Sequence, residues 1–166
     1  MDTTPDHFRN PPPRRIGALG WLERPDGRLA VIRRAYWGAI SQWGLPGGSA
    51  PPNTHPRSAL TLAVAAKLGL RVTPARKLAS DYAPAKPGQY EGTNEIYHAL
   101  LPAGAEAQLA ADCGYVELRW VSVEQALELA VDHERTRIEQ CAHALADGSY
   151  RELYLGLPFP HPTTSS

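Results

Sequence analysis

The hydrophobic pattern near the start of the chain predicts a β-hairpin. Residues 16–23 form an apolar run typical of a strand, and residues 29–33 form a second one. Pro25, Asp26 and Gly27 between them are turn-forming residues. We therefore expect the two runs to pair as neighbouring strands.

The apolar positions take a helical spacing after residue 54. Three of them recur at intervals of four and share one face: Leu60, Val64 and Leu68. Thr54 is a suitable N-cap residue, and Pro56 follows where a first-turn proline is tolerated. Gly69 is a typical C-terminal stop. The pattern predicts a helix that ends at residue 68.

Later apolar runs predict three more strands, within residues 71–82, 94–101 and 114–121. Ser122 is a plausible cap for a short helix that runs to Ala130, and a last helix spans residues 133–146 before Gly148. The aromatic segment 36–43 fits either a loop or an edge strand. This order of elements predicts an α/β fold, a sandwich with a mixed β-sheet.

Length and composition predict one domain with two loose ends. A chain of 166 residues fits a single sizeable core. Residues 1–15 contain four prolines and little hydrophobicity, which indicates a disordered arm. We expect the folded domain over residues 16–157 and a flexible tail over residues 158–166.

Composition and charge also indicate the cellular location of the protein and the classes of partner that it binds. The formal net charge is zero, so no overall field attracts nucleic acid or a membrane. No apolar run approaches the roughly 18 residues that a membrane span requires, and the first 15 residues lack a secretory signal. The two cysteines lack metal-site spacing and are interpreted as buried thiols. We expect a cytoplasmic protein, and 14 arginines against 3 lysines indicate a GC-rich bacterial genome.

Acidic residues are distributed unevenly along the chain. No Asp or Glu lies between Asp26 and Asp81, although eight lysines and arginines do. Magnesium prefers oxygen ligands, usually carboxylates. This third of the protein therefore offers no carboxylate to a metal ion.

The motif Trp-Gly-Leu-Pro-Gly-Gly at residues 43–48 resembles the start of the Nudix box. Counted from Gly48, the spacing of the box is kept up to its final Gly69-Leu70. The charged positions of the box are occupied by other residues: Thr54, Leu62, Ala63, Ala66 and Lys67. The resemblance extends over roughly residues 16–157 and implies the Nudix fold.

The resemblance also implies where a metal would bind. Positions 63, 66 and 67 share one face of a helix, and family members that hydrolyse pyrophosphates hold Mg²⁺ there with carboxylates. Alanine has no ligand atom, and a protonated lysine has no lone pair. We therefore expect neither bound metal nor cofactor. Nudix domains often dimerise, so a homodimer is a partner that the resemblance allows.

Four residues are candidate ligand contacts: Tyr36, Trp43, Lys67 and Tyr82. The Lys67 ammonium could replace the metal cation and hold an anionic ligand, or it could be an ordinary exposed helix lysine. The aromatic rings before the glycine loop could stack on a flat ligand. They could equally pack in the core.

Four titratable residues outside the box are candidate acids or bases: Asp81, His98, His133 and Glu134. His98 shares a strand face with Ile96 and Leu100, so it is either a core histidine or a pocket residue. His133 and Glu134 open a helix, where an acid also simply favours the helix dipole.

Three functions remain open from the sequence. The first is a metal-independent enzyme acting on a small organic substrate in a bacterial biosynthetic pathway. The second is a non-catalytic module that binds a nucleotide or sugar nucleotide. The third is a weak Nudix hydrolase with relocated metal ligands.

Overall fold

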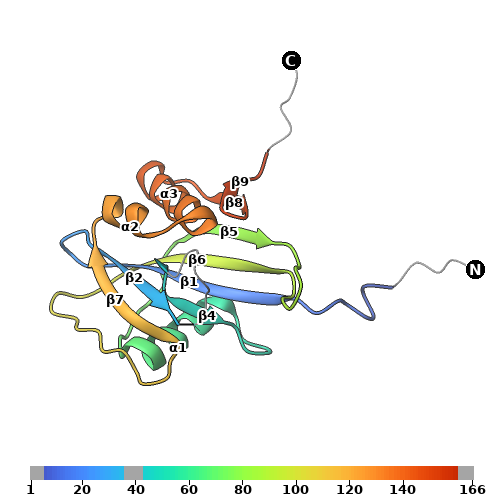
Figure 1. Cartoon of the computed structure of the whole chain (residues 1–166), viewed down its shortest axis with the longest axis horizontal. Helices are drawn as coiled ribbons and strands as arrows, with labels where there is room; N and C mark the ends of the chain where they lie inside the picture. The colour runs from blue at the N-terminus through green and yellow to red at the C-terminus, as the bar shows by residue number, and fades with distance from the viewer. Residues whose placement is uncertain (1–5, 36–42, 161–166) are drawn as a thin grey trace, which may run out of the picture.

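The computed structural model describes residues 6–35 and 43–160 (Figure 1). Nine strands are present in these ranges: β1 (Arg15–Glu23), β2 (Leu29–Arg34), β3 (Trp43–Gly44), β4 (Gly47–Ser49), β5 (Lys77–Ala83), β6 (Gly92–Leu100), β7 (Tyr115–Val121), β8 (Arg151–Tyr154) and β9 (Leu157–Pro158). The same ranges contain three helices: α1 (Pro56–Leu68), α2 (Val123–Leu129) and α3 (Asp132–Asp147).

The strands form one mixed sheet, as predicted. Its main path runs β3-β2-β1-β6-β5-β8-β9, with β4 paired to β1 and β7 paired to β2. The pairs β1–β6 and β5–β8 are parallel, and the other pairs are antiparallel. The parallel β1–β6 pair brings residues 77 positions apart into register, with Glu23 opposite Leu100.

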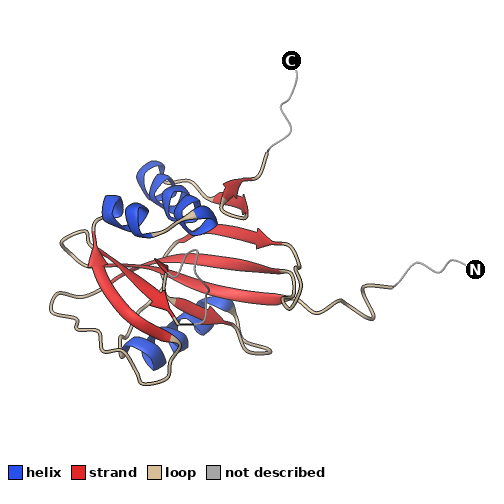
Figure 2. Cartoon of the chain, in the orientation of Figure 1, coloured by secondary structure: helices blue, strands red, loops and turns tan. Residues whose placement is uncertain are grey.

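Helices cover both faces of the sheet (Figure 2), which confirms the α/β sandwich. The helix α1 packs on one face, where Leu60, Val64 and Leu68 are buried as the spacing predicted. The helices α2 and α3 lie on the other face, where Ile138 and Cys141 enter a second core. Transfer of these apolar side chains from water is the main stabilising contribution.

The helix ends follow the sequence signals with one exception. The N-cap of α1 is His55 rather than Thr54, because the Nδ1 atom of His55 accepts a hydrogen bond from the Arg57 N–H at 3.1 Å. The predicted stop at Gly69 and the predicted cap at Ser122 are confirmed, and Ser122 forms a reciprocal capping box with Gln125.

The strands β8 and β9 were not predicted. They contain four and two residues, too few to show a period in the sequence. They are held by β5 and by a tight approach to α3 at Gly156, where a built Cβ would lie 2.3 Å from the Thr136 Oγ1 atom.

Residues 36–42 of the predicted loop or edge strand lie outside the described residues, and Trp43 begins β3.

Both cysteines are free thiols, but only Cys141 is buried as predicted, and Cys113 is half-buried. Cys141 lies on the buried face of α3, and burial raises the pKa of its thiol to about 12. In the described ranges, no helix has the length and apolar character required to cross a membrane.

Candidate functional site

The glycine motif, residues 43–48, lies in the sheet and contributes the two short strands β3 and β4. Its Trp43 and Gly44 pair with β2, and its Gly47 and Gly48 pair with β1. A Cβ at position 47 would lie 2.0 Å from the Ala18 carbonyl oxygen, so only glycine fits there. The motif therefore brings its backbone close to β1 and presents the Gly47 carbonyl to α1.

Lys67 lies at this junction of loop and helix. Its ammonium donates a hydrogen bond to the Gly47 carbonyl oxygen at 2.8 Å, and the Tyr115 hydroxyl donates to the same oxygen at 2.5 Å. Burial, followed by the positive charge of Arg34, lowers the pKa of Lys67. Lys67 is therefore a half-buried cation that holds the glycine loop, and its contact with a ligand stays a prediction.

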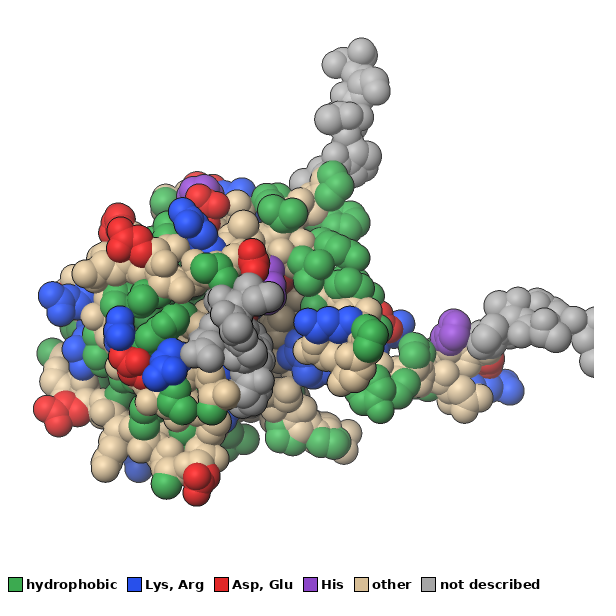
Figure 3. Space-filling view, in the orientation of Figure 1, with side chains coloured by type: hydrophobic (Ala, Val, Ile, Leu, Met, Phe, Trp, Pro, Cys, Tyr) green, Lys and Arg blue, Asp and Glu red, His purple; other side chains and the backbone are tan. Residues whose placement is uncertain are grey.

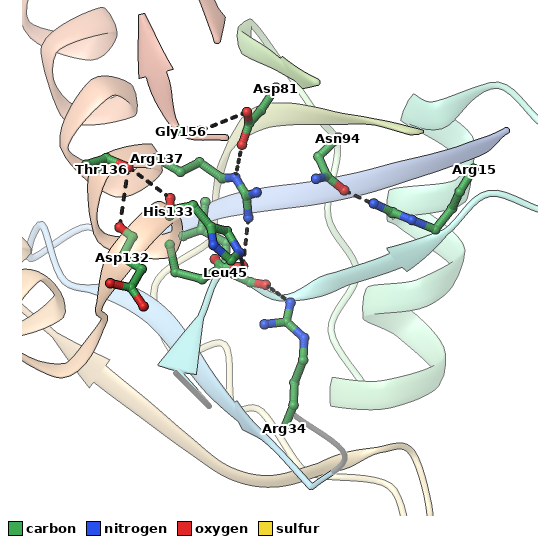
Figure 4. Close-up of polar contacts among 11 residues, drawn as sticks. Arg15, Arg34, Leu45, Asp81, Asn94, Asp132, His133, Thr136, Arg137 and Gly156 are labelled. Atoms are coloured by element: carbon green, nitrogen blue, oxygen red, sulfur yellow. Dashed lines mark hydrogen bonds and ion pairs between the residues drawn. The ribbon is translucent and has the colours of Figure 1, made fainter. Parts of the chain in front are cut away.

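A buried ion network joins α3 to β5 (Figure 4). The Arg137 guanidinium donates from Nε to Asp81 at 2.6 Å and from Nη1 to Glu134 at 2.8 Å. The three side chains are almost fully buried, with at most 4% exposed. Burial opposes the charge of Arg137, but the two carboxylates outweigh it and raise the pKa of the guanidinium.

Asp81 has both carboxylate oxygens engaged, since its Oδ1 atom accepts from the Gly156 N–H at 2.9 Å. Glu134 keeps its Oε2 atom without a hydrogen-bond partner in the described structure. That oxygen lies against the backbone of Gly44, where a built Cβ would be 2.6 Å away. The glycine motif thus contacts the ion network as well as Lys67.

Arg34 lies between the two parts of the site. Its Nη2 atom donates to the Leu45 carbonyl at 2.9 Å, and its Nη1 atom lies 2.8 Å from a Cβ built on Gly44. Asn94 and Arg15, which are hydrogen bonded at 3.0 Å, flank the same region from β6 and β1 (Figure 4). The described surroundings of the glycine motif therefore contain several cations.

His133 stands at the rim of the ion network. It is the second residue of α3, its side chain is 39% exposed, and its Nε2 atom lies 3.8 Å from Glu134 Oε1. Burial is the main cause that lowers its pKa, although the Glu134 charge acts in the opposite direction. A neutral imidazole near neutral pH can accept a proton.

We expect the imidazole resonances of His133 to titrate with a midpoint below the ordinary value of about 6.5. The folded state then favours the neutral ring, so the stability that this group contributes is complete above that value. It is lost as the pH falls from there towards the folded-state pKa. NMR titration of the full chain tests this, with a short histidine-containing model peptide as the reference. A midpoint equal to or above that of the model peptide would contradict the prediction.

The other predicted site residues lie elsewhere. The Nε2 atom of His98 lies 3.0 Å from the Glu23 carboxylate. His98 is four residues farther along β6 than Asn94, so the two residues are about 13 Å apart along the strand. Tyr82 projects from the opposite sheet face to its neighbour Asp81 and donates to Glu91 at 2.5 Å. Trp43 packs against the core beneath the Arg119 guanidinium. Tyr36 lies outside the described residues.

Sequence reasoning missed Arg137, Tyr115 and Asn94. One signal for Arg137 was present, because Glu134 and Arg137 occupy the same helical stripe as Ile138 and Cys141. Charged residues on an apolar stripe must be paired if the stripe is buried. No comparable signal marks Tyr115, which lies 68 residues from the glycine that it binds.

A family model for the NUDIX domain matches residues 13–141, which is well over half of the chain. The chain belongs to the Nudix family. A search of curated proteins finds no match. The Nudix fold and a hydrolase-like architecture are therefore established, and the functional roles of the residues above rest on their geometry.

Solved structures agree with this Nudix assignment. The MutT protein from Methanosarcina mazei Go1 is 15% identical with a TM-score of 0.66, over 84% of this chain and 98% of that one. The E. coli ORF135 protein is 21% identical with a TM-score of 0.65, over 81% of this chain and 92% of that one. A UDP-X diphosphatase is 16% identical with a TM-score of 0.62, over 86% of this chain and 68% of that one. Identities this low show the common fold.

Proposed function

We propose that this Nudix-fold protein binds the anionic group of a small organic ligand through Lys67, without a magnesium ion, and acts on it by acid–base chemistry. The observation that carries the proposal is the Lys67 ammonium, 2.8 Å from the Gly47 carbonyl oxygen. It occupies the face of α1 on which the Nudix box would bring carboxylates together. A fixed ammonium there supplies positive charge without a metal.

The donor atoms around this face do not fit Mg²⁺. Ala63 and Ala66 carry no ligand atom, and the first turn of α1 contains no acid. Within residues 6–35 and 43–160, no group of three His, Cys, Asp or Glu side chains is arranged to hold a metal ion. The positive charges of Lys67 and Arg34 would also repel a divalent cation.

The proposed base is His133. Burial lowers the pKa of His133 and so favours its neutral imidazole, and Glu134 lies 3.8 Å from it, close enough to stabilise the imidazolium that proton uptake creates. A cyclisation, isomerisation or hydrolysis in a bacterial biosynthetic pathway would need such a base. The UDP-X diphosphatase that shares the fold supports a phosphorylated small molecule as the ligand class.

A binding role without turnover is the second candidate. It is favoured by the buried ion network, because Asp81 and Glu134 are both committed to Arg137. Two of the four candidate acid–base residues are then structural. Replacing His133 by glutamine separates the candidates once a reaction is known, because full turnover in that variant would remove the proposed base.

Anion binding by Lys67 is tested with inorganic pyrophosphate and UDP-glucose in EDTA, followed by calorimetry on the full chain. We expect Lys67→Met to weaken binding about tenfold or more, because a charge-assisted hydrogen bond is removed. Binding to the unchanged protein should also weaken as the pH rises through the lowered pKa of Lys67, since the neutral amine no longer attracts the anion.

Two matched variants serve as controls for this experiment. Lys67→Arg keeps the charge and should keep most of the affinity. Arg28→Met removes an exposed arginine of the turn between β1 and β2 and should have no effect. Equal affinity in Lys67→Met, or binding that occurs only after Mg²⁺ is added, would refute the proposal.

A further inference from the structure

An apolar row crosses the outer strands on the sheet face opposite to α3. Tyr82 lies opposite Tyr154 in the β5–β8 pair, and Tyr154 lies opposite Leu157 in the β8–β9 pair. The two tyrosine rings are 5.6 Å apart at a tilt of 41°. We call Tyr82, Tyr154 and Leu157 the tyrosine row.

The tyrosine row is open to solvent. Its side chains are 36%, 40% and 58% exposed, and Phe159 beside it is 50% exposed. The helix on this side, α1, packs over β1 and β4 instead. Hydrophobic side chains accordingly gather over β8 and β9 at the base of the C-terminal tail (Figure 3). A continuous apolar row of this kind marks an interaction surface.

Acidic side chains lie along the row. Glu91 accepts the hydrogen bond of the Tyr82 hydroxyl. Glu152 is exposed two residues before Tyr154 on β8, and its carbonyl accepts a hydrogen bond from the Phe159 N–H. Aromatic rings beside carboxylates are the features by which proteins recognise proline-rich segments with basic residues. Such segments lose little conformational entropy because they are already extended in polyproline II form.

The chain itself contains a segment with this chemistry. Its N-terminal arm, residues 6–14, carries Pro11, Pro12 and Pro13 between two arginines. Phe8 in the arm is 94% exposed. The root of the arm is tied to the domain by Arg14, whose Nε atom lies 2.7 Å from Glu91. From that point the arm extends away from its own domain (Figure 1).

We propose that the tyrosine row binds the proline-rich arm of a second copy of this chain. The arm extends outward from the edge of its own row, so its prolines and Phe8 are presented to another molecule. Arg14 already pairs with Glu91 of its own copy, so it is Arg9 of the arm that complements the exposed Glu152 of the other copy in charge. Because each copy carries one arm and one row, two copies can exchange arms in a closed symmetric dimer. This inference is independent of the ligand chemistry at Lys67.

The test is sedimentation velocity on the full chain over a range of concentrations. We expect a monomer–dimer equilibrium whose dissociation constant rises about tenfold or more in Tyr154→Ser and in Phe8→Ser, since each removes an apolar anchor. Leu62→Ser is the control, because Leu62 is 61% exposed on α1 and lies away from the row. Its dissociation constant should not change.

A synthetic peptide of residues 1–14 provides a second measurement, and it should compete with the dimer of the full chain. A chain that stays monomeric at every concentration would overturn the proposal. If the chain is always monomeric but binds the peptide only when Tyr154 is present, then the tyrosine row accepts the arm of its own copy. That result would also overturn the proposed dimer. A dimer that persists unchanged in both serine variants forms through another surface, and the exchange of arms would then be wrong.

Discussion

Replacing Arg137 by leucine is expected to lower the free energy of unfolding by about 3–5 kcal/mol, because a buried charge pair loses one partner. Asp81 and Glu134 are fully buried, and both depend on the Arg137 guanidinium for neutralisation. Their carboxylates would remain buried without the guanidinium to which both are hydrogen bonded. Urea denaturation followed by circular dichroism measures the loss.

Two further variants show whether the cost arises from uncompensated charge. Arg135→Leu changes an exposed arginine of the same helix and should alter stability by no more than about 0.5 kcal/mol. The combined variant Asp81→Asn, Glu134→Gln and Arg137→Met removes all three charges and should recover much of the loss. If Arg137→Leu lowered the free energy of unfolding no more than Arg135→Leu does, the ion network would not contribute to stability.

The elements that the sequence predicts correctly are those with strong local signals. The interval-four spacing in α1, the cap at Ser122 and the glycine stops at Gly69 and Gly148 depend on neighbours within one or two helical turns. The glycine motif is equally local, because backbone conformation and close approach are encoded in the glycines themselves.

The candidate site could be predicted only in part, because its contacts join distant segments. Asp81 and Arg137 are 56 residues apart, and their pairing depends on how α3 lies across β5. His98 and Asn94 both lie on β6, yet His98 contacts Glu23 and Asn94 accepts a hydrogen bond from Arg15, because the position along the strand decides which residue of β1 each one meets. Local patterns carry no information on such packing.

Installing three carboxylates on α1 is expected to create a magnesium site where the native side chains provide none. The variant Ala63→Glu, Ala66→Glu and Lys67→Glu should bind Mg²⁺ with a dissociation constant on the order of 1 mM, because the three positions share one helix face. Ala66 is exposed and Ala63 and Lys67 are half-buried, so the longer side chains have room to reach solvent. Isothermal titration calorimetry detects the gain.

A second triple variant, whose positions also share one helix face, separates a site beside the glycine motif from clustered negative charge elsewhere on α1. Ser58→Glu, Leu62→Glu and Ala65→Glu add three carboxylates to exposed positions of α1, away from the Lys67 face. This variant should bind Mg²⁺ more weakly than the first by about tenfold. Equal binding by both would mean that the geometry at the glycine motif makes no contribution.

Magnesium dependence of the unchanged full chain tests the central claim most directly. Binding of UDP-glucose, and turnover of any nucleoside diphosphate derivative, should be the same in EDTA and in millimolar Mg²⁺. The reason is that, in the proposed function, the Lys67 ammonium takes the place of the metal, and the first turn of α1 contains no acid. Turnover that requires Mg²⁺ at millimolar or lower concentration would contradict this claim and would instead indicate a Nudix hydrolase with relocated metal ligands.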